Sequence, residues 1–469
     1  MPSNKLVSLL STLSPREWQR FQEFASSPYF NKRTELIPLL SYFQTQLGES
    51  DTFEIDKQAI FEVVYPERTV DHQFLAYQFN YLLALSEHFL AQEALGQDSF
   101  VLQKSKLHLL IERRLDKHFK FHYKKAQQFV SQNHERNDVF WRNQFYLAEI
   151  SAQAFMNKRQ RQYDQSFQQL SDSLDHYYFY EKLRYSCAMV NIEGIASSTY
   201  EIKMINAILE HLRNAPSVDF HLEIYQLIYL CLTREAIDPF FPKLKELISQ
   251  HQYDLSKEEQ REILLFSINI CARKIRKGQN EFYKQALTFY MLGIENRALF
   301  AGKHLTHWTF NNVVKLILRL EDHDGALRFM DENAQHLASN VREDTLNYNL
   351  AELAFSKGDY DGVLQKLHHI KFTDPQYFLG SRIIYLKSFF ELGAFDSMAS
   401  QLASFIMFLR RNKKISSDYK KTLLNFCSLL HLILRSKPDR KPRVIAKIKE
   451  TKQKIEEAWL LEVATRVLR

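Results

Sequence analysis

Turn-forming residues are scarce throughout this sequence. Glycine and proline number 11 each among 469 residues, which is about 2% apiece against typical usage of roughly 7% and roughly 5%. Sheet-rich folds need frequent turns, and turns draw heavily on these two residue types. The scarcity therefore predicts long helices joined by short connections, that is, an all-α fold.

The composition also predicts a well-packed core. Hydrophobic residues make up 45% of the chain and aromatic residues 13%, which is ample for a continuous apolar interior and argues against disorder. A chain of this length would usually form about three compact domains. An array of helical repeats is the exception to that expectation, because it grows by adding units rather than by enlarging one core.

Helix-start signals are clear near the N-terminus. The stretch SPREWQRFQEF at 14–24 places Ser14 as N-cap, Pro15 at the first helical position and Glu17 three residues after the cap, which is the pattern of a capping box. Asn31 is a candidate cap for the next helix. Beyond residue 100, amphipathic runs alternate with short breaks, a pattern typical of helical hairpins stacked in series.

One such hairpin is readable between residues 344 and 375. Gly358 is expected to end one helix in a left-handed conformation, and Pro375, preceded by the candidate cap Asp374, begins another. Gly393 follows Gly358 by 35 positions and repeats the layout. The expected apolar stripes of the first two helices are Leu346, Leu350, Leu353 and Ala354, and then Val363, Leu364, Leu367 and Ile370.

These residues resemble a tetratricopeptide repeat, a helix pair of about 34 residues with a W-x2-L-G-x2-Y, A-x3-F and Pro pattern. Leu350 and Pro375 match the pattern, and Gly358-Asp359-Tyr360 stands at its turn. The positions of Trp, Gly, Tyr, Ala and Phe in the pattern are occupied by Asn347, Ala351, Ala354, Val363 and Leu367. The likeness covers residues 307–412.

The whole chain is also similar to a family of bacterial helical proteins that carries no assigned activity. The stretches behind this likeness are LSPREWQRFQEFASSPYFN at 13–31 and SLDHYYFYEKLRYSC at 173–187. This likeness implies helical repeats, and the tetratricopeptide-like pattern implies a right-handed α-solenoid of stacked helical hairpins. The expected segments are an N-terminal helical domain or cap at 1–100, irregular helical hairpins at 101–306, tetratricopeptide-like repeats at 307–412, and basic capping helices at 413–469.

Such a fold implies a non-catalytic scaffold that binds a protein or peptide partner on its concave face, which the first helix of each pair lines. Trp308 has an alternative role as packing between repeats. A clamp for a C-terminal carboxylate is not favoured, because Gly380 and Ile384 stand where Lys or Arg would be needed. By register, the expected partner-binding residues are Trp308, Asn311, Asn312, Lys315, Asn349, Glu352 and Lys387.

Sequence motifs for chemistry are absent. The chain contains no GxGxxG, GxxxxGK[ST], GxSxG or HExxH, so no enzyme, cofactor or small-molecule substrate is expected. His118 and His122 lie four apart on an expected helix and could bind a metal from one face. Their neighbours are lysines rather than carboxylates or thiols, which favours surface or partly packed histidines and no metal site.

The C-terminal region carries the chain's basic charge. Residues 410–469 hold 17 Lys or Arg against 6 Asp or Glu, a net of +11, whereas the other 409 residues hold 45 against 49, a net of −4. A nucleic-acid-associated protein is therefore the alternative function, with KHFKFHYKK at 117–125 as a second basic stretch. Capping helices that solvate a lysine-rich face are the favoured explanation of the charge. The basic candidates are Arg410, Arg411, Lys413, Lys414, Arg440, Lys441 and Arg443.

The four cysteines are at least 40 positions apart and lie in apolar runs, as expected of small buried residues in a reducing compartment. No signal-peptide cleavage pattern follows the first residues, and the apolar stretch at 423–434 is too short to span a bilayer. A cytoplasmic location without membrane attachment is expected. The cysteines are Cys187, Cys231, Cys271 and Cys427.

Overall fold

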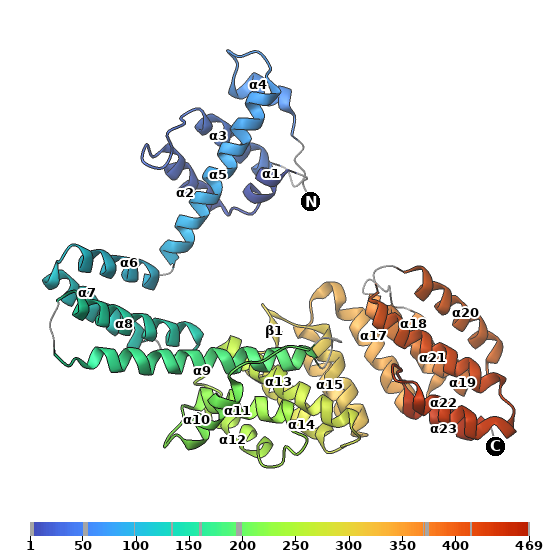
Figure 1. Cartoon of the computed structure of the whole chain (residues 1–469). Coiled ribbons are helices and arrows are strands. Elements are labelled where there is room, and N and C mark those ends of the chain that lie inside the picture. The colour runs from blue at the N-terminus through green and yellow to red at the C-terminus, as the bar shows by residue number, and fades with distance from the viewer. Residues whose placement is uncertain are drawn as a thin grey trace. The chain divides into compact units, whose positions relative to one another are not determined.

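The computed structural model of the chain describes residues 4–49, 55–97, 99–132, 135–158, 162–193, 199–368, 370, 375–412 and 415–467. Over these residues the chain forms 23 α-helices and one short β-hairpin (Figure 1), which confirms the all-α prediction. The chain divides into two compact units, Met1–Phe179 and Tyr180–Arg469. No helix in the described ranges is long and apolar enough to cross a membrane.

The first unit is built from two hydrophobic clusters, one within residues 6–89 and one within residues 100–150. The last helix of the unit, α9, continues into the second unit. The helices are α1 Lys5–Leu10, α2 Pro15–Ser26, α3 Leu36–Glu49, α4 Lys57–Val64, α5 His72–Gln97, α6 Ser99–Glu112, α7 Asp116–Ser131, α8 Asp138–Asn157 and α9 Gln165–Glu193.

The capping box predicted at the start of α2 is present. Glu17 accepts a hydrogen bond from the Ser14 backbone N–H at 2.8 Å, the Ser14 hydroxyl accepts from the Glu17 N–H at 3.3 Å, and Pro15 is the first helical residue. Asn31, in contrast, does not cap α3. It is buried and binds the backbone of Ala25 and Arg33, so it fixes the loop between the two helices instead.

The second unit contains the remaining helices and the β-hairpin. Tyr180 of α9 donates to Glu259 at 2.5 Å, and the guanidinium of Arg184 binds Glu262 at 2.7 Å, which ties α9 to α13. The elements are α10 Ile205–Asn214, α11 Phe220–Thr233, α12 Phe241–His251, α13 Lys257–Arg276, α14 Phe282–Glu295, β1 Phe300–Ala301, β2 His304–Leu305, α15 His307–Arg319, α16 His323–Asn333, α17 Ser339–Ser356, α18 Tyr360–His368, α19 Pro375–Glu391, α20 Phe395–Arg411, α21 Ser417–Arg435, α22 Lys441–Glu450 and α23 Glu457–Val467.

Helices α15 to α20 pack as three consecutive pairs, α15 with α16, α17 with α18 and α19 with α20. In addition α15 contacts α17, and α17 contacts α19, so the first helices of the pairs are neighbours. Gly358 and Gly393 follow α17 and α19 with φ of +77° and +70°, as predicted for turn glycines. Pro375 begins α19 as predicted, whereas Asp374 lies outside the described residues.

The buried face of α17 is broader than the predicted stripe. Tyr348 and Ala351 are buried together with Leu353, whereas Leu346 and Leu350 are only half-buried. The reason is that α17 packs against α15, α18 and α19 at once, so its interior face is not set by one partner. In α18, Val363 and Leu367 are buried as predicted.

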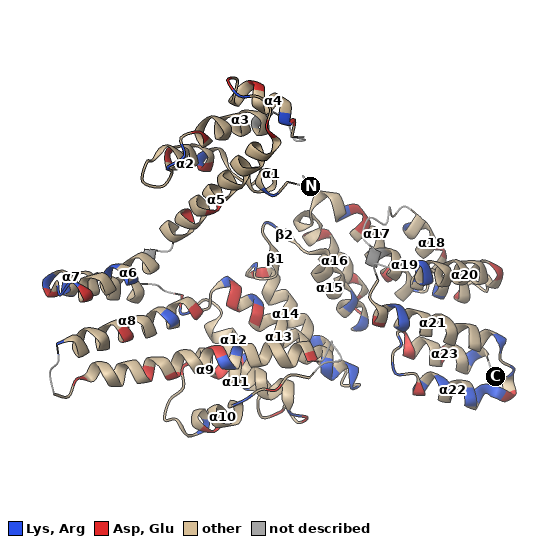
Figure 2. Cartoon of the chain, turned by 45° about the horizontal axis from the view of Figure 1, so that its top comes forward, with Lys and Arg blue, Asp and Glu red and all other residues tan. Residues whose placement is uncertain are grey.

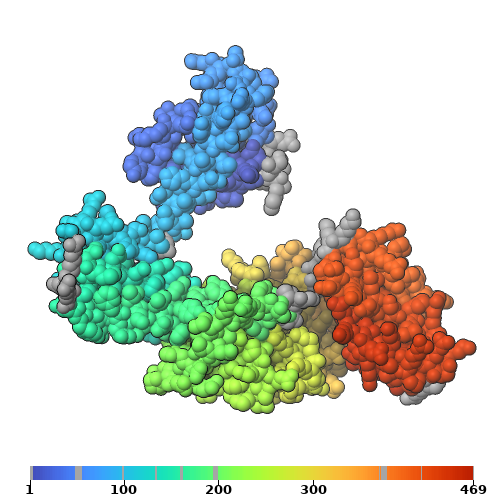
Figure 3. All heavy atoms as spheres, viewed as in Figure 1, coloured from blue at the N-terminus to red at the C-terminus, as the bar shows by residue number. Residues whose placement is uncertain are grey.

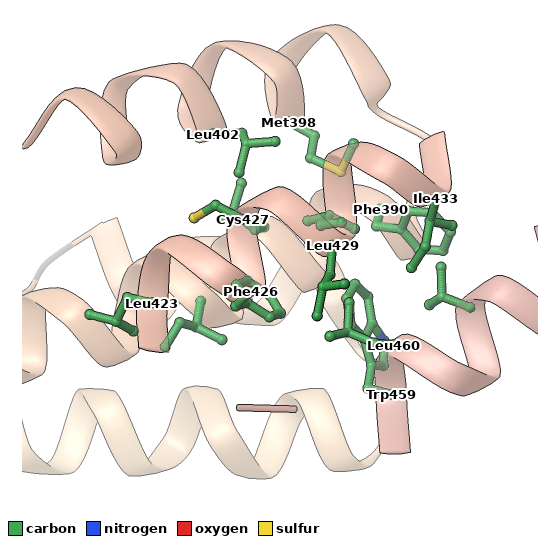
Figure 4. Close-up of a cluster of buried hydrophobic side chains, with 14 of the residues drawn as sticks. Phe390, Met398, Leu402, Leu423, Phe426, Cys427, Leu429, Ile433, Trp459 and Leu460 are labelled. Carbon is green, nitrogen blue, oxygen red and sulfur yellow. The ribbon is translucent and has the colours of Figure 1, made fainter. Parts of the chain in front are cut away.

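One hydrophobic cluster of the second unit joins α19 to α23. Phe426 and Ile433 of α21 are fully buried, and Trp459 of α23 packs edge-on against Phe390 of α19 at 5.5 Å between ring centroids (Figure 4). In the space-filling view these helices, orange to red, form one continuous mass of atoms (Figure 3). The cluster holds the last helices of the chain firmly in place.

All four cysteines are buried, as their apolar surroundings predict. Burial raises the pKa of the Cys231, Cys271 and Cys427 thiols to about 12. Thiolates are therefore disfavoured at neutral pH, and these cysteines act as small apolar residues.

Candidate functional site

The exposed side of α15 carries a stripe of large polar and aromatic side chains. Trp308, Asn312, Lys315 and Arg319 are spaced by four, three and four residues, so they share one helical face. All four are exposed, and Trp308 keeps 41% of its surface accessible. Thr306, whose hydroxyl accepts from the Thr309 N–H at 3.2 Å, caps the helix and fixes where this stripe begins.

A charged network connects α15 to α17. The Lys315 ammonium lies 3.3 Å from a carboxylate oxygen of Glu352 and donates to the Tyr348 hydroxyl at 3.2 Å. Tyr348 in turn donates to Glu352 at 2.8 Å. Each of the three groups is thus satisfied by the other two, which fixes their geometry.

The network holds both charged groups in their ionised forms. The Glu352 carboxylate raises the pKa of Lys315 above its usual range, against the effect of desolvation. Burial alone would raise the pKa of Glu352, but the ammonium of Lys315 and the Tyr348 hydroxyl together keep it below its usual value. The ion pair therefore persists across the neutral range.

A second ion pair joins α19 to the segment before α23. The Lys387 ammonium lies 2.7 Å from Glu456 and 4.3 Å from the centroid of the Phe355 ring. Only 12% of the Lys387 side chain is exposed. Glu456 has φ of +55°, a left-handed conformation that non-glycine residues adopt at an energetic cost and often near functional surfaces.

These two ion pairs line one hollow of about 310 Å³, which we call the ion-paired hollow. Its charged lining consists of three cations and two carboxylates, and Leu318, Phe355 and Ser356 also line it. The charged residues are Lys315, Arg319, Lys387, Glu352 and Glu456. The hollow therefore offers both signs of charge within a small volume.

Gly380 of α19 makes this arrangement possible. A Cβ atom at that position would lie 2.7 Å from the Tyr348 hydroxyl oxygen, closer than a non-bonded contact allows. The absence of a side chain lets Tyr348 reach the position from which it binds both Lys315 and Glu352. Position 380, where a carboxylate clamp would have needed a Lys or Arg, must therefore be a glycine for Tyr348 to fit.

The seven predicted partner-binding residues fall into three groups, of which two are exposed or line the hollow and the third is buried. Lys315, Glu352 and Lys387 line the ion-paired hollow. Trp308 and Asn312 lie exposed on α15, where Asn312 also donates to the Tyr290 hydroxyl at 3.0 Å.

Asn311 and Asn349 do not line an open face as expected. Both are buried, and the Asn349 amide donates to the Asn311 side-chain oxygen at 2.5 Å and to the Thr345 carbonyl at 2.8 Å. The physical reason is that α15 and α17 pack against each other here, so the two side chains meet inside the contact between the helices. They stabilise the helix pair rather than meet a partner.

Sequence reasoning missed Tyr348, Arg319, Phe355 and Glu456. Tyr348 and Glu352 are four residues apart on one helix, a spacing that could have revealed their hydrogen bond. Glu456 lies 69 positions from Lys387, in a segment between helices. No local pattern connects such a pair.

The basic residues of the tail have different environments. Arg410 and Arg411 end α20 and are exposed, and Lys441 donates to the Thr465 carbonyl at 3.0 Å. Lys413 and Lys414 lie outside the described residues. Arg440 and Arg443 line a second hollow with Lys447, on the basic side of α22 (Figure 2).

The second basic stretch, 117–125, lies on α7 in the first unit. Phe119, Lys120 and Tyr123 from this stretch line a hollow of about 570 Å³. Asp116 and Asp164 also line it, and carboxylates at this position oppose the binding of a polyanion. His118 is exposed, and partial burial together with Lys106 lowers the pKa of His122.

Among the residues that the structure describes, no three or more His, Cys, Asp or Glu side chains are grouped as a metal site would require. Comparisons with models of protein families, with curated proteins and with solved structures find no match to this chain.

Proposed function

We propose that this chain is a non-catalytic scaffold, a right-handed α-solenoid of tetratricopeptide-like hairpins that binds a protein or peptide partner on the face formed by α15, α17 and α19. The single observation that carries this proposal is the exposed stripe on α15 leading directly into the ion-paired hollow. The neighbouring first helices of three consecutive pairs support the solenoid arrangement.

The chemistry of the face suits a protein partner. Trp and Arg are the residue types that most often dominate binding energy at protein interfaces, and Trp308 and Arg319 stand exposed at the two ends of the α15 stripe. The ion-paired hollow, which Arg319 also lines, presents both cations and carboxylates. A polypeptide segment with side chains of both charges can satisfy such a surface, whereas a uniform polyanion would meet Glu352 and Glu456.

The protonation states in the hollow favour recognition over catalysis. A general base or acid works best with a pKa near the operating pH. The Glu352 carboxylate shifts the pKa of Lys315 upward, and the Lys315 ammonium helps to keep the pKa of Glu352 below its usual value. Both shifts lead away from neutrality, so neither group is poised for proton transfer.

The test begins with affinity capture of the native protein from a lysate of its own cells, with and without nuclease, to obtain the partner. Recovery of that partner is then compared between the wild type and the double variant Trp308→Ala with Arg319→Ala. We expect recovery to fall at least about tenfold, because central Trp and Arg contacts each contribute on the order of 1 to 2 kcal/mol or more to an interface.

The matched control is the double variant Gln365→Ala with Lys366→Ala, two exposed residues of α18. It should recover the partner as well as the wild type does. Melting midpoints of all three proteins must be measured first, so that loss of binding is not loss of fold. Equal recovery by the α15 variant, at an unchanged melting midpoint, would remove the proposal.

A further inference from the structure

The second hollow, which we call the α22 hollow, has a charge pattern that the scaffold function does not use. It measures about 600 Å³ and lies between the end of α21 and one side of α22. Arg440, Arg443 and Lys447 line it, spaced by three and four residues so that they share one helical face. All three side chains are exposed.

These three cations have no partner in the described part of the chain, and unlike the equally unpaired Arg435, Lys437 and Lys449 of the same segment they line one hollow. Elsewhere in the same region Lys441 binds a backbone carbonyl, Lys454 binds Glu457 and Arg466 binds Glu391. Within the described residues, the side chains of Arg440, Arg443 and Lys447 make no hydrogen bond or ion pair. Their mutual repulsion is therefore uncompensated in the absence of a ligand.

We propose that the α22 hollow binds a compact polyphosphate group. Two arginines and one lysine converging from one helical face supply the forked and single donors that phosphate oxygens accept. The volume is within the range of sites for small molecules. Glu450 is the single carboxylate among the described lining residues, so the lining keeps a net charge of about +2, which suits a group with several negative charges.

The rest of the lining favours a compact anion over a nucleic-acid strand. Leu432, Val444 and Ala446 supply its apolar part, and no aromatic side chain lines the hollow within the described residues. Single-strand binders stack bases on aromatic rings along an extended basic track. The α22 hollow has neither feature, so we expect it to bind one compact group of phosphates rather than an extended strand.

The direct test is isothermal titration calorimetry of the full chain with inorganic triphosphate. We expect one binding site per chain. In the triple variant Arg440→Gln, Arg443→Gln and Lys447→Gln the affinity should fall at least about thirtyfold, because each charge-assisted hydrogen bond contributes a factor of roughly ten or more. The melting midpoint should stay close to that of the wild type, since all three positions are exposed.

The matched control removes three other exposed cations of the same segment, Arg435→Gln, Lys437→Gln and Lys449→Gln. It loses the same net charge but leaves the hollow intact, and should bind triphosphate within about threefold of the wild type, an effect of long-range charge alone. Equal weakening in both triple variants, or no measurable binding by the wild type, would overturn the proposal.

A gain-of-binding variant and two other probes complete the test. Glu450→Gln should tighten triphosphate binding severalfold, because it removes a carboxylate from the lining.

A nucleoside triphosphate that binds as well as inorganic triphosphate would show that phosphate alone is recognised. Tighter binding of the nucleoside triphosphate would identify a nucleotide as the source of that phosphate. The second probe is a single-stranded oligonucleotide of about 20 nucleotides. If it displaces both triphosphates and its affinity also falls equally in the two triple variants, the basic residues form a nucleic-acid surface and the polyphosphate site is ruled out.

Discussion

The ion-paired hollow and the α22 hollow, both in the second unit, use charge in opposite ways. In the ion-paired hollow, Lys315 and Lys387 bind Glu352 and Glu456, so much of the charge is already satisfied within the protein. In the α22 hollow, Arg440 and its two neighbours have no partner among the residues that the structure describes. Internal pairing fixes a shape that a partner can fit, whereas unpaired charge attracts an oppositely charged ligand.

The construction of the two hollows explains this difference. The ion-paired hollow draws its groups from α15, α17, α19 and the segment before α23. Residues from four places in the chain can be arranged so that opposite charges meet. The cations of the α22 hollow lie on one side of a single helix and its preceding turn, where three like charges at helical spacing cannot neutralise one another.

The largest expected effect comes from deleting residues 436–469, which removes the α22 hollow and Glu456 together. Trp459, Leu460 and Val463 bury their side chains against the cluster that includes Phe426 (Figure 4). Each contributes about 1.5 to 3 kcal/mol of burial, so the truncated chain should lose well over about 5 kcal/mol of stability and aggregate. Size-exclusion chromatography and thermal melting measure this.

A monodisperse truncated chain that melts with the wild type would contradict that expectation. It would show that the last helices are an independent appendage. In that case the contact between Lys387 and Glu456 could not be part of a stable ion-paired hollow, and the comparison between the hollows would fail.

A smaller effect separates buried from exposed amides on the partner-binding face. Asn349→Ala removes the buried hydrogen bond that the Asn349 amide donates to the Asn311 oxygen, which should lower the free energy of unfolding by about 2 kcal/mol. Asn312→Ala is the matched control, since Asn312 is exposed, and should cost less than about 1 kcal/mol. Urea denaturation monitored by circular dichroism measures both, and equal losses would show that the contact between α15 and α17 is not as described.

The smallest predicted effect concerns pH. The folded-state pKa of Glu352 is below its unfolded value, so its ionised form contributes stability that is present above the unfolded pKa and is lost as pH falls through the folded one. Glu352→Gln should therefore reduce the dependence of stability on pH below about 4.5, by on the order of 1 kcal/mol. Denaturation midpoints of both proteins between pH 3 and 7 measure this slope.

The matched acidic control for that experiment is Glu332→Gln, because Glu332 is exposed and belongs to α16, away from the ion-paired hollow. This variant should keep the acid slope of the wild type. An identical slope for Glu352→Gln and the wild type would show that the Lys315 ion pair does not hold its carboxylate ionised.

The sequence predicted those parts of the fold that depend on local chemistry. The capping box at Ser14, the turn glycines Gly358 and Gly393 and the helix start at Pro375 are each determined by a few consecutive residues. The register of the repeat also placed Trp308 and Lys315 on the exposed side of α15, where the structure has them.

The rest of the site depends on which helices are neighbours. Asn349 was expected to be exposed because its position in the repeat often is, yet the close contact of α15 with α17 buries it against Asn311. Glu456 joins the hollow from a distant segment. A single sequence carries no signal for either contact, because both depend on the packing of helices far apart in the chain.

Site-specific photo-crosslinking can show whether a protein partner binds on the face formed by α15, α17 and α19. A photoreactive amino acid replaces Trp308 in one protein and Lys366 of α18 in another, and each is irradiated in its native cells. We expect a discrete crosslinked partner from position 308 and none from position 366. The same adducts from both positions, or a partner from position 366 alone, would contradict binding on this face.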